Sequence, residues 1–362
     1  MASALRSPVD LLDRVRRDVE RNALRARNGV KLVAGVGRPH LGQSPKDLIW
    51  SRGHAQLWRY RSDRVALQPP LLIVFSLVSK SYVLDLQPGN SFVEHLLSAG
   101  FDVFILDWRQ ADAREAGERL EDYADGYVPE AVEQTRKAAG TDTVNLFGYC
   151  YGGVLALLYV AHHADAPLRS LSVMATPVDF SQWGLWRNLA DDHLPFDAIL
   201  DEDGNVPAST IRQGFRLLKP TGEIRQYATL LDNVWNDDYV TAYQAMTGWS
   251  NDHVPFPGAA ARQTMEMLVR DNGFVSDRVR LNGDPVHLSD IRVPLLTVIA
   301  ERDHIVPEPV AAPLPALVGA EDNEVLRLDA GHVGLVVGRT AAKITIPRII
   351  EFLAARSEAV AE

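Results

Sequence analysis

The chain has 362 residues, of which 46% are hydrophobic and 23% are charged. This composition is typical of a globular protein, and the length suits one α/β core with an insertion better than two unrelated domains. The 37 basic and 47 acidic residues give a formal net charge of -10 without long charged runs, so we expect no nucleic-acid partner.

Two further absences indicate where the protein works. No segment reaches the roughly 20 consecutive apolar residues that span a bilayer, so we predict no transmembrane segment, and the N-terminus lacks the apolar core of a secretion signal. The chain has one cysteine, Cys150, which excludes an intramolecular disulfide and fits a reducing compartment. We therefore expect a cytoplasmic protein.

The N-terminal segment, residues 1–43, has the pattern of a helix. Leu12, Val15, Val19 and Ala23 recur at steps of three and four residues between arginines. A basic amphipathic helix can also dock on a membrane or a partner, but this stripe favours a helix that packs against the rest of the chain.

Strand and helix patterns alternate after residue 44. Residues 57–60 alternate like an edge strand, and continuous apolar runs typical of buried strands follow at 70–75, 101–108, 144–147 and 168–175. Helical patterns lie between these runs, at 92–97 and 129–139. Strands that alternate with helices in this way predict a mostly parallel sheet with right-handed crossovers.

The alternation is interrupted between residues 178 and 287. This stretch has tryptophans, scattered prolines and a helical pattern at 259–270, but no buried strand run. Strand patterns resume at 293–300 and 324–328, and a helix is predicted at 341–355. We therefore predict an α/β core of residues 44–177 and 288–362, with residues 178–287 inserted as a helical cap.

A candidate nucleophile lies in the sequence GYCYGG at residues 148–153, between a strand pattern and an apolar helical run. This arrangement predicts a nucleophile elbow, in which a tight turn presents the central side chain above the sheet and small residues let strand and helix approach closely. The motif alone is a weak signal. The flanking elements and the presence of the only thiol at its centre favour a nucleophile over a buried cysteine that acts as a small hydrophobe.

The elbow resembles that of α/β-hydrolase enzymes, in which an acid follows a late strand and a histidine follows the last one. Asp303 and His332 occupy these two places. Each could instead be an ordinary loop residue, and His304 competes for the role of base, although it shares a loop with Asp303. The resemblance implies a catalytic triad of Cys150 as nucleophile, His332 as base and Asp303 as the acid that orients it.

An oxyanion hole in such enzymes combines two backbone amides. One is expected from Tyr151, the residue after the nucleophile, and the other from the loop 76–82, where we choose Val78 or the residue on either side. Neither a phosphate-binding glycine loop nor a metal-spaced cluster is present in the sequence, so we predict no cofactor and no metal.

Several further motifs, together with the cysteine in the elbow, are similar to those of polyhydroxyalkanoate synthases. These motifs are DLQPG at 85–89, TPVDF at 176–180, WSND at 249–252, FPG at 256–258 and DHIVP at 303–307. The similarity covers about residues 44–352. PKDLIW at 45–50 and GHVG at 331–334 resemble the short class III catalytic subunit. Two departures are Tyr151, where the family often has Gln, Met or Leu, and Ser79, where Asn is common.

This resemblance implies an acyltransferase that joins (R)-3-hydroxyacyl units, with 3-hydroxybutyryl-CoA as the expected substrate, and releases coenzyme A. The acyl group would be carried as a thioester on Cys150 while the polyester grows. The family also implies a homodimer, a non-catalytic partner subunit or both, and a place on the surface of polymer granules. Two alternatives remain: a cysteine-elbow thioesterase or hydrolase with the same triad, and a non-catalytic granule-associated homologue.

Overall fold

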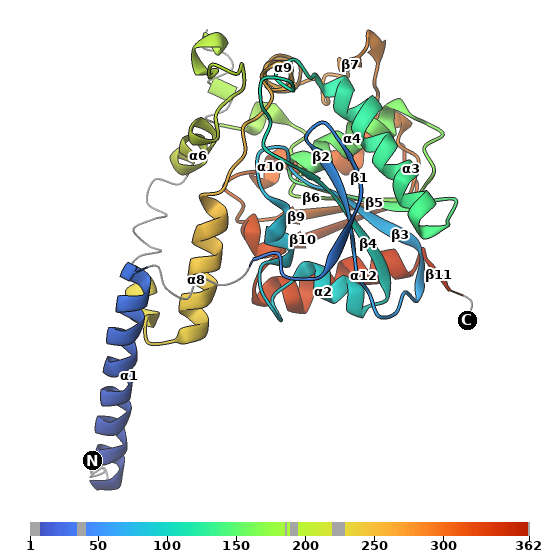
Figure 1. Ribbon diagram of the computed structural model, residues 1–362. Helices are drawn as coiled ribbons and strands as arrows, with labels where there is room; N and C mark the ends of the chain where they lie inside the picture. Colours follow the sequence, from blue (N-terminus) through green and yellow to red (C-terminus); the bar gives the residue numbers. More distant parts are fainter. Residues whose placement is uncertain (1–7, 35–40, 185–186, 189–194, 219–228, 361–362) are drawn as a thin grey trace, which may run out of the picture.

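A nine-stranded, mostly parallel sheet forms the centre of the computed structural model, which describes residues 8–34, 41–184, 187–188, 195–218 and 229–360 (Figure 1). The strand order is β1-β2-β4-β3-β5-β6-β9-β10, with β11 paired to β3. The strands are β1 (Lys46–Arg52), β2 (Ala55–Tyr60), β3 (Leu67–Val74), β4 (Phe101–Trp108), β5 (Val144–Tyr149), β6 (Leu168–Met174), β9 (Leu295–Ala300), β10 (Asn323–Leu328) and β11 (Glu358–Ala359).

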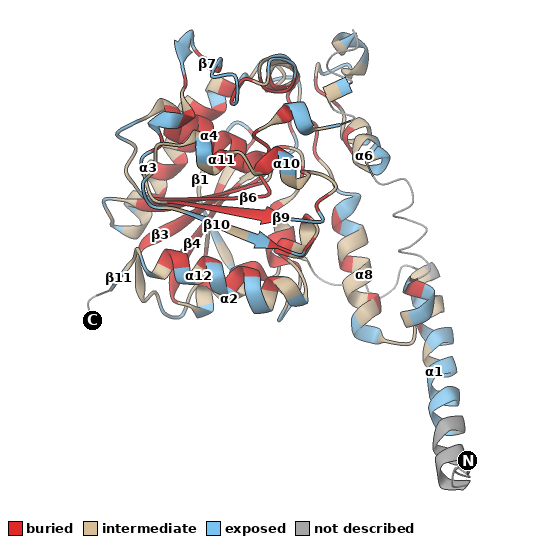
Figure 2. Ribbon diagram, turned by 180° about the vertical axis from the view of Figure 1, so that it is seen from behind, coloured by how far each residue is buried: buried red, intermediate tan, exposed pale blue. Residues whose placement is uncertain are grey.

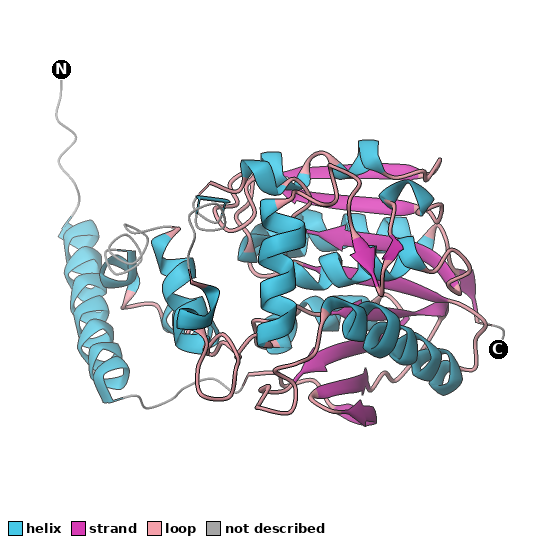
Figure 3. Ribbon diagram, turned by 90° about the horizontal axis from the view of Figure 1, so that it is seen from above, coloured by secondary structure: helices cyan, strands magenta, loops and turns pink. Residues whose placement is uncertain are grey.

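Helices cover both faces of this sheet (Figure 3). The α-helices are α1 (Pro8–Ala34), α2 (Phe92–Ser98), α3 (Val128–Ala139), α4 (Tyr151–His162), α6 (Ala208–Leu217), α8 (Asp237–Ser250), α9 (Gly258–Gln263), α10 (Glu308–Ala311), α11 (Leu314–Leu317) and α12 (Ile346–Ala354). The short 3₁₀ helices are η1 (Ser81–Asp85), η3 (Phe180–Gln182), η4 (Phe196–Ile199), η6 (Leu288–Asp290) and η7 (Val333–Leu335), and the π-helical turns are η2 (Asp122–Tyr127), η5 (Thr264–Arg270) and η8 (Ala341–Thr345).

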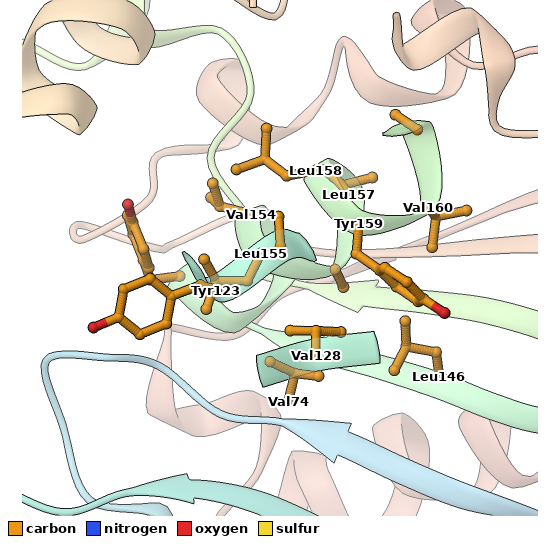
Figure 4. Packing of buried hydrophobic residues seen from close by; sticks show 14 of the residues in the cluster. Val74, Tyr123, Val128, Leu146, Val154, Leu155, Leu157, Leu158, Tyr159 and Val160 are labelled. Carbon is orange, nitrogen blue, oxygen red and sulfur yellow. The ribbon is translucent and has the colours of Figure 1, made fainter. Parts of the chain in front are cut away.

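The two faces of the sheet bury alternate side chains of the same strand, because successive side chains of a strand point to opposite sides. In β3, Leu72 and Val74 pack with α3 and α4, whereas Leu71 and Ile73 pack with α2 and α12. Figure 4 shows the first of these clusters, where side chains of α4 lie over Val74. Burial on both faces explains why the central strands are continuous apolar runs in the sequence. The predicted α/β-hydrolase fold is confirmed.

The prediction that residues 57–60 form an edge strand is wrong. They belong to β2, which is paired on both sides, antiparallel to β1 and to β4. On this side of the sheet the edge strand is β1, which begins at Lys46. In β2, Ala55 and Leu57 are buried on one face of the sheet and Tyr60 is buried on the other.

Residues 178–287, here called the inserted segment, contribute no strand to the central sheet among their described residues. They contribute helices, including α6, α8 and α9, and a small hairpin of β7 (Arg280–Leu281) and β8 (Asp284–Pro285). Trp186, which the sequence analysis counted among the tryptophans of this segment, lies outside the described residues. The exact limits of a cap remain a prediction.

The N-terminal helix α1 extends away from the sheet beside α8 (Figures 1 and 2). Its described contacts begin at Arg21, whose guanidinium lies 4.6 Å from the centroid of the Trp235 ring. Nearer its C-terminal end Arg27 forms an ion pair with Asp237, and the Asn28 side chain donates a hydrogen bond of 2.8 Å to the carbonyl of Val234. The expectation that the apolar stripe packs against the chain is wrong for Val19 and Ala23, which are exposed, whereas the side chains of Leu12 and Val15 lie outside the described residues. No helix in the described ranges, α1 included, is both long and apolar enough to cross a bilayer.

Candidate active site

Cys150 lies in a strained turn between β5 and α4. Its φ of 55° and ψ of -124° are rare for a residue with a side chain, and such a conformation costs about 1–3 kcal/mol. Two backbone hydrogen bonds hold the turn: the Cys150 amide donates to Met174 and the Gly153 amide donates to Cys150, each at 2.9 Å. The strain therefore persists because the neighbouring strand and helix hold it.

The glycines of the elbow allow backbones to approach more closely than any side chain would permit. A Cβ atom at Gly152 would lie 2.1 Å from the carbonyl oxygen of Val74, and one at Gly153 would lie 1.9 Å from Oγ1 of Thr176. At Gly148 a Cβ would lie 2.4 Å from Cα of Gly153. These contacts explain the small residues on both sides of Cys150.

His332 and Asp303 form a buried pair. His332 Nδ1 lies 2.7 Å from Asp303 Oδ2, and both side chains are almost completely buried. The other carboxylate oxygen, Oδ1, accepts hydrogen bonds from the backbone amides of Ile305, at 2.8 Å, and Val306, at 3.0 Å. The Asp303 carboxylate is therefore fixed in position by its own loop and orients the imidazole of His332.

His332 also interacts with Cys150, and both side chains line the same cavity. Burial alone would lower the pKa of the His332 imidazole. The charges of Asp303 and Cys150 and the hydrogen bonds to both have a larger effect, and they raise this pKa to about 10. Tyr149 supports the ring from the other side: the ring centroids are 5.2 Å apart, and the phenol donates a 3.3 Å hydrogen bond to the His332 carbonyl. The three residues predicted as a triad thus lie together.

Cys150 and His332 open into a cavity of about 720 Å³ between the core and the inserted segment. The core contributes Phe75, Ser76, Val78, Ser79, Tyr149, His304, Ile305 and Val333, and the inserted segment contributes Arg212, Phe215, Arg216, Leu217, Thr229, Tyr239, Tyr243, Met246, Thr247, Trp249, Ser250, Asn251 and His253. His304 therefore lines the cavity, but the carboxylate of Asp303 orients the ring of His332.

Tyr151 points away from this cavity. Its ring packs edge-on against Phe256, with centroids 5.2 Å apart, and its hydroxyl bonds Thr264 of η5. As the first residue of α4, Tyr151 has a backbone N–H without an acceptor inside the helix. The Tyr151 side chain therefore does not line the cavity, while its backbone amide stays beside Cys150.

Val78 lies in the loop 76–82, which the inserted segment holds by three hydrogen bonds. His253 Nδ1 donates to the Val78 carbonyl at 3.0 Å, and the Trp249 indole donates to the Lys80 carbonyl at 2.8 Å. The hydroxyl of Tyr82 donates to Asp252 at 2.9 Å. We call residues 249–253 the clamp. The WSND motif marked this segment in the sequence, but not its contact with the loop.

A second group of polar side chains lies at the far end of α4 from Cys150. Asp125 Oδ1 lies 2.8 Å from His162 Nδ1 and 3.0 Å from His163 Nε2, and these three residues offer ligand atoms of the kind that bind a metal ion. This group was not predicted from the sequence, because Asp125 is distant in sequence from the two histidines. It lies apart from the nucleophile cavity.

Comparison with known proteins identifies the family. A model of the alpha/beta hydrolase fold matches residues 69–338, and a model of the poly-beta-hydroxybutyrate polymerase (PhaC) N-terminus matches residues 3–96. The poly(3-hydroxyalkanoate) polymerase subunit PhaC of Allochromatium vinosum is 35% identical over 318 residues, which are 86% of this chain and 89% of that protein. The chain belongs to the PhaC family of poly(3-hydroxyalkanoate) polymerase subunits. The resemblance predicted from the motifs is confirmed.

Other PhaC proteins agree with this assignment, and a solved structure agrees with the fold. The PhaC of Thiocystis violacea is 32% identical and the alignment covers 87% of this chain and 90% of that one. The PhaC of Haloferax mediterranei is 31% identical over 89% of this chain, which spans only 66% of that relative. A Pseudomonas aeruginosa hydrolase has a TM-score of 0.51 at 16% identity, over 86% of this chain and 99% of its own. That likeness shows the fold alone.

Proposed function

We propose that this chain polymerises (R)-3-hydroxyacyl units from coenzyme A thioesters, such as 3-hydroxybutyryl-CoA, and carries the growing polyester on Cys150. The relatives are named poly(3-hydroxyalkanoate) polymerase subunits, which supports the reaction class. The observation that carries the mechanism is the hydrogen-bonded pair of His332 and Asp303 beside Cys150, which lies in a strained turn between β5 and α4.

The first step loads the enzyme. His332 takes the proton of the Cys150 thiol, and the thiolate attacks the carbonyl carbon of the thioester. A bond forms between Sγ and the acyl carbon, the bond between that carbon and the sulfur of coenzyme A breaks, and His332 returns the proton to the departing thiolate. One thioester replaces another, so the free-energy change is small.

The second step needs His332 to act as a base towards a hydroxyl group. Loading converts Cys150 to a neutral thioester, which removes one of the two charges that raise the pKa of His332. The pKa of the imidazole therefore falls when it must accept the hydroxyl proton. The hydroxyl oxygen then bonds the acyl carbon, the bond to Sγ breaks, and the proton on His332 restores the ion pair with the Cys150 thiolate.

Both steps develop negative charge on the carbonyl oxygen. We assign its stabilisation to the backbone amide of Tyr151 and to that of Val78, or of a neighbour in the loop 76–82. Tyr151 follows the nucleophile at the start of α4, and Val78 lines the same cavity as Cys150. No cofactor or metal is part of this mechanism.

The relatives are named as subunits, which supports a partner for this chain. We propose a homodimer, a non-catalytic partner subunit or both, with the enzyme in the cytoplasm at the surface of polymer granules. The main alternative is a hydrolase that uses the same three residues and passes the acyl group to water. A cavity walled on one side by the inserted segment favours the synthase, because limiting access of water protects the thioester.

An assay of coenzyme A release from 3-hydroxybutyryl-CoA, with and without a candidate partner subunit, tests this proposal. A synthase releases coenzyme A and forms insoluble polyester. Release of coenzyme A with free 3-hydroxybutyrate in place of polyester would identify a hydrolase. No release under either condition would identify a non-catalytic homologue.

A further inference from the structure

Two adjacent histidines at the C-terminal end of α4 direct their rings at one carboxylate. Oδ1 of Asp125 lies 2.8 Å from Nδ1 of His162 and 3.0 Å from Nε2 of His163, and the three ligand atoms all lie within 4.8 Å of one another. The side chains of His162, His163 and Asp125 are 18%, 34% and 19% exposed, so an ion from solvent can reach them. Their ligand atoms therefore converge at an accessible point.

The end of the helix explains how neighbouring residues reach the same oxygen. Side chains of adjacent residues in a regular helix do not face each other. His162 is the last residue of α4, and at His163 the chain leaves the helix with φ of -119° and ψ of 82°. The carbonyls at the end of a helix also carry partial negative charge, which favours a cation there. The local backbone thus presents two nitrogen ligands where positive charge is stabilised.

The carboxylate is held from its other side. Asp125 belongs to η2, and its second oxygen, Oδ2, accepts a hydrogen bond of 2.8 Å from the side-chain amide of Asn282. Asn282 lies in the turn between β7 and β8 of the inserted segment. A partner of this kind orients a ligating carboxylate and leaves its first oxygen for the ion.

Two imidazole nitrogens and one carboxylate oxygen are a ligand set that suits Zn²⁺. Bonds of about 2.0–2.2 Å to a tetrahedral ion place its ligand atoms about 3.4 Å apart. The oxygen and the two nitrogens are separated by 2.8 and 3.0 Å here, so a shift of about half an ångström admits the ion. Water would complete the tetrahedron.

We propose that Asp125, His162 and His163 bind one zinc ion, which joins η2 to the end of α4. Through Asn282 the same carboxylate also contacts the inserted segment, so the ion stabilises the junction of that segment with the core. The site lies outside the cavity that contains Cys150, and its role is structural. This inference departs from the sequence-based expectation of a chain without a metal.

Zinc binding to the full-length chain tests the site, and neither readout depends on acyl transfer. Cys150→Ala is used as the background, because Cys150 and His332 offer a second pair of zinc ligands. After dialysis against EDTA, we expect calorimetric titration with Zn²⁺ to give one ion per chain, and zinc to raise Tm. In this background His162→Asn and His163→Asn should each weaken binding about 10-fold or more and lose the rise in Tm. Unfolding curves in EDTA show whether each variant is folded.

His287→Asn in the same background is the matched control. His287 Nδ1 lies 2.7 Å from Asp277 Oδ1, so this change removes the imidazole of an aspartate–histidine pair outside the proposed site. It should retain the zinc affinity and the rise in Tm. Absence of zinc binding in the folded Cys150→Ala chain, or unchanged affinity in both His162→Asn and His163→Asn, would overturn the site and leave a hydrogen-bonded cluster only.

Discussion

At the scale of single residues, the charge of Asp303 sets the protonation of His332. The raised pKa of His332, about 10, depends on that charge and on Cys150, and the imidazolium is present below this pKa and lost above it. Asp303→Asn removes one of the two charges, so the pKa should fall. The alkaline limb of the pH profile for single-turnover acylation should therefore move to lower pH, by about one unit or more.

The control for this prediction is Asp329→Asn, which removes an exposed carboxylate that pairs with Arg302 outside the triad. It should leave the alkaline limb in place. A profile for Asp303→Asn that coincides with that of Asp329→Asn would show that the buried carboxylate does not control His332.

The proximity of the three proposed catalytic residues was easier to predict than their surroundings. Cys150, Asp303 and His332 were identified because the elbow motif and chain order of α/β hydrolases leave few candidate positions. The direction of the Tyr151 ring could not be predicted, since it depends on Phe256 and Thr264, which lie more than a hundred residues away in sequence.

At the scale of elements, the clamp joins the inserted segment to the loop 76–82, which we propose supplies an oxyanion amide. Trp249→Phe keeps an aromatic ring but removes the indole N–H that bonds the Lys80 carbonyl. The loop amide assigned to the oxyanion should then lose its exact placement, and kcat should fall about 10-fold with little change in KM. Steady-state coenzyme A release measures both constants.

Trp235→Phe is the matched control. In the wild type, the Trp235 indole also donates to a backbone carbonyl within the inserted segment, that of Asp232. The variant should retain the wild-type kcat. If the two variants lose the same activity, the clamp has no special part in catalysis.

The strands that are buried on both faces of the sheet were the easiest elements to predict from the sequence. The central strands were predicted closely because both faces are buried, so each is a continuous apolar run. β1 was missed and β2 was misplaced because their residues face different environments on each side. The hydrogen bonds of the clamp were not predicted, because they join the loop 76–82 to the inserted segment across about 170 residues of sequence.

At the scale of the whole molecule, two parts of the chain, the core and the inserted segment, together line the cavity. We propose that the inserted segment closes over Cys150 in the free chain and that opening is coupled to self-association or to a partner. Specific activity should then rise with the concentration of protein or partner subunit. The measurement is activity and protease cleavage of the inserted segment over a concentration series, with and without substrate.

Constant specific activity with an unchanging cleavage pattern would contradict this coupling. The position of α1 suits a role in association, because this 27-residue helix extends from the core and contacts the rest of the chain near Arg27 and Asn28. Its exposed position could not be read from its amphipathic pattern, since the pattern shows that a helix has an apolar face and not what covers it.

The central claim is that the acyl group is carried on Cys150, and mass spectrometry of the trapped enzyme tests it most directly. The chain is mixed with 3-hydroxybutyryl-CoA, quenched in acid within one turnover and digested. We predict one or more hydroxybutyryl units on the peptide that contains Cys150, removable by hydroxylamine, and none in a folded Cys150→Ala variant. Polyester formation at the wild-type rate by Cys150→Ala, or an adduct on another residue of the wild type, would contradict the account.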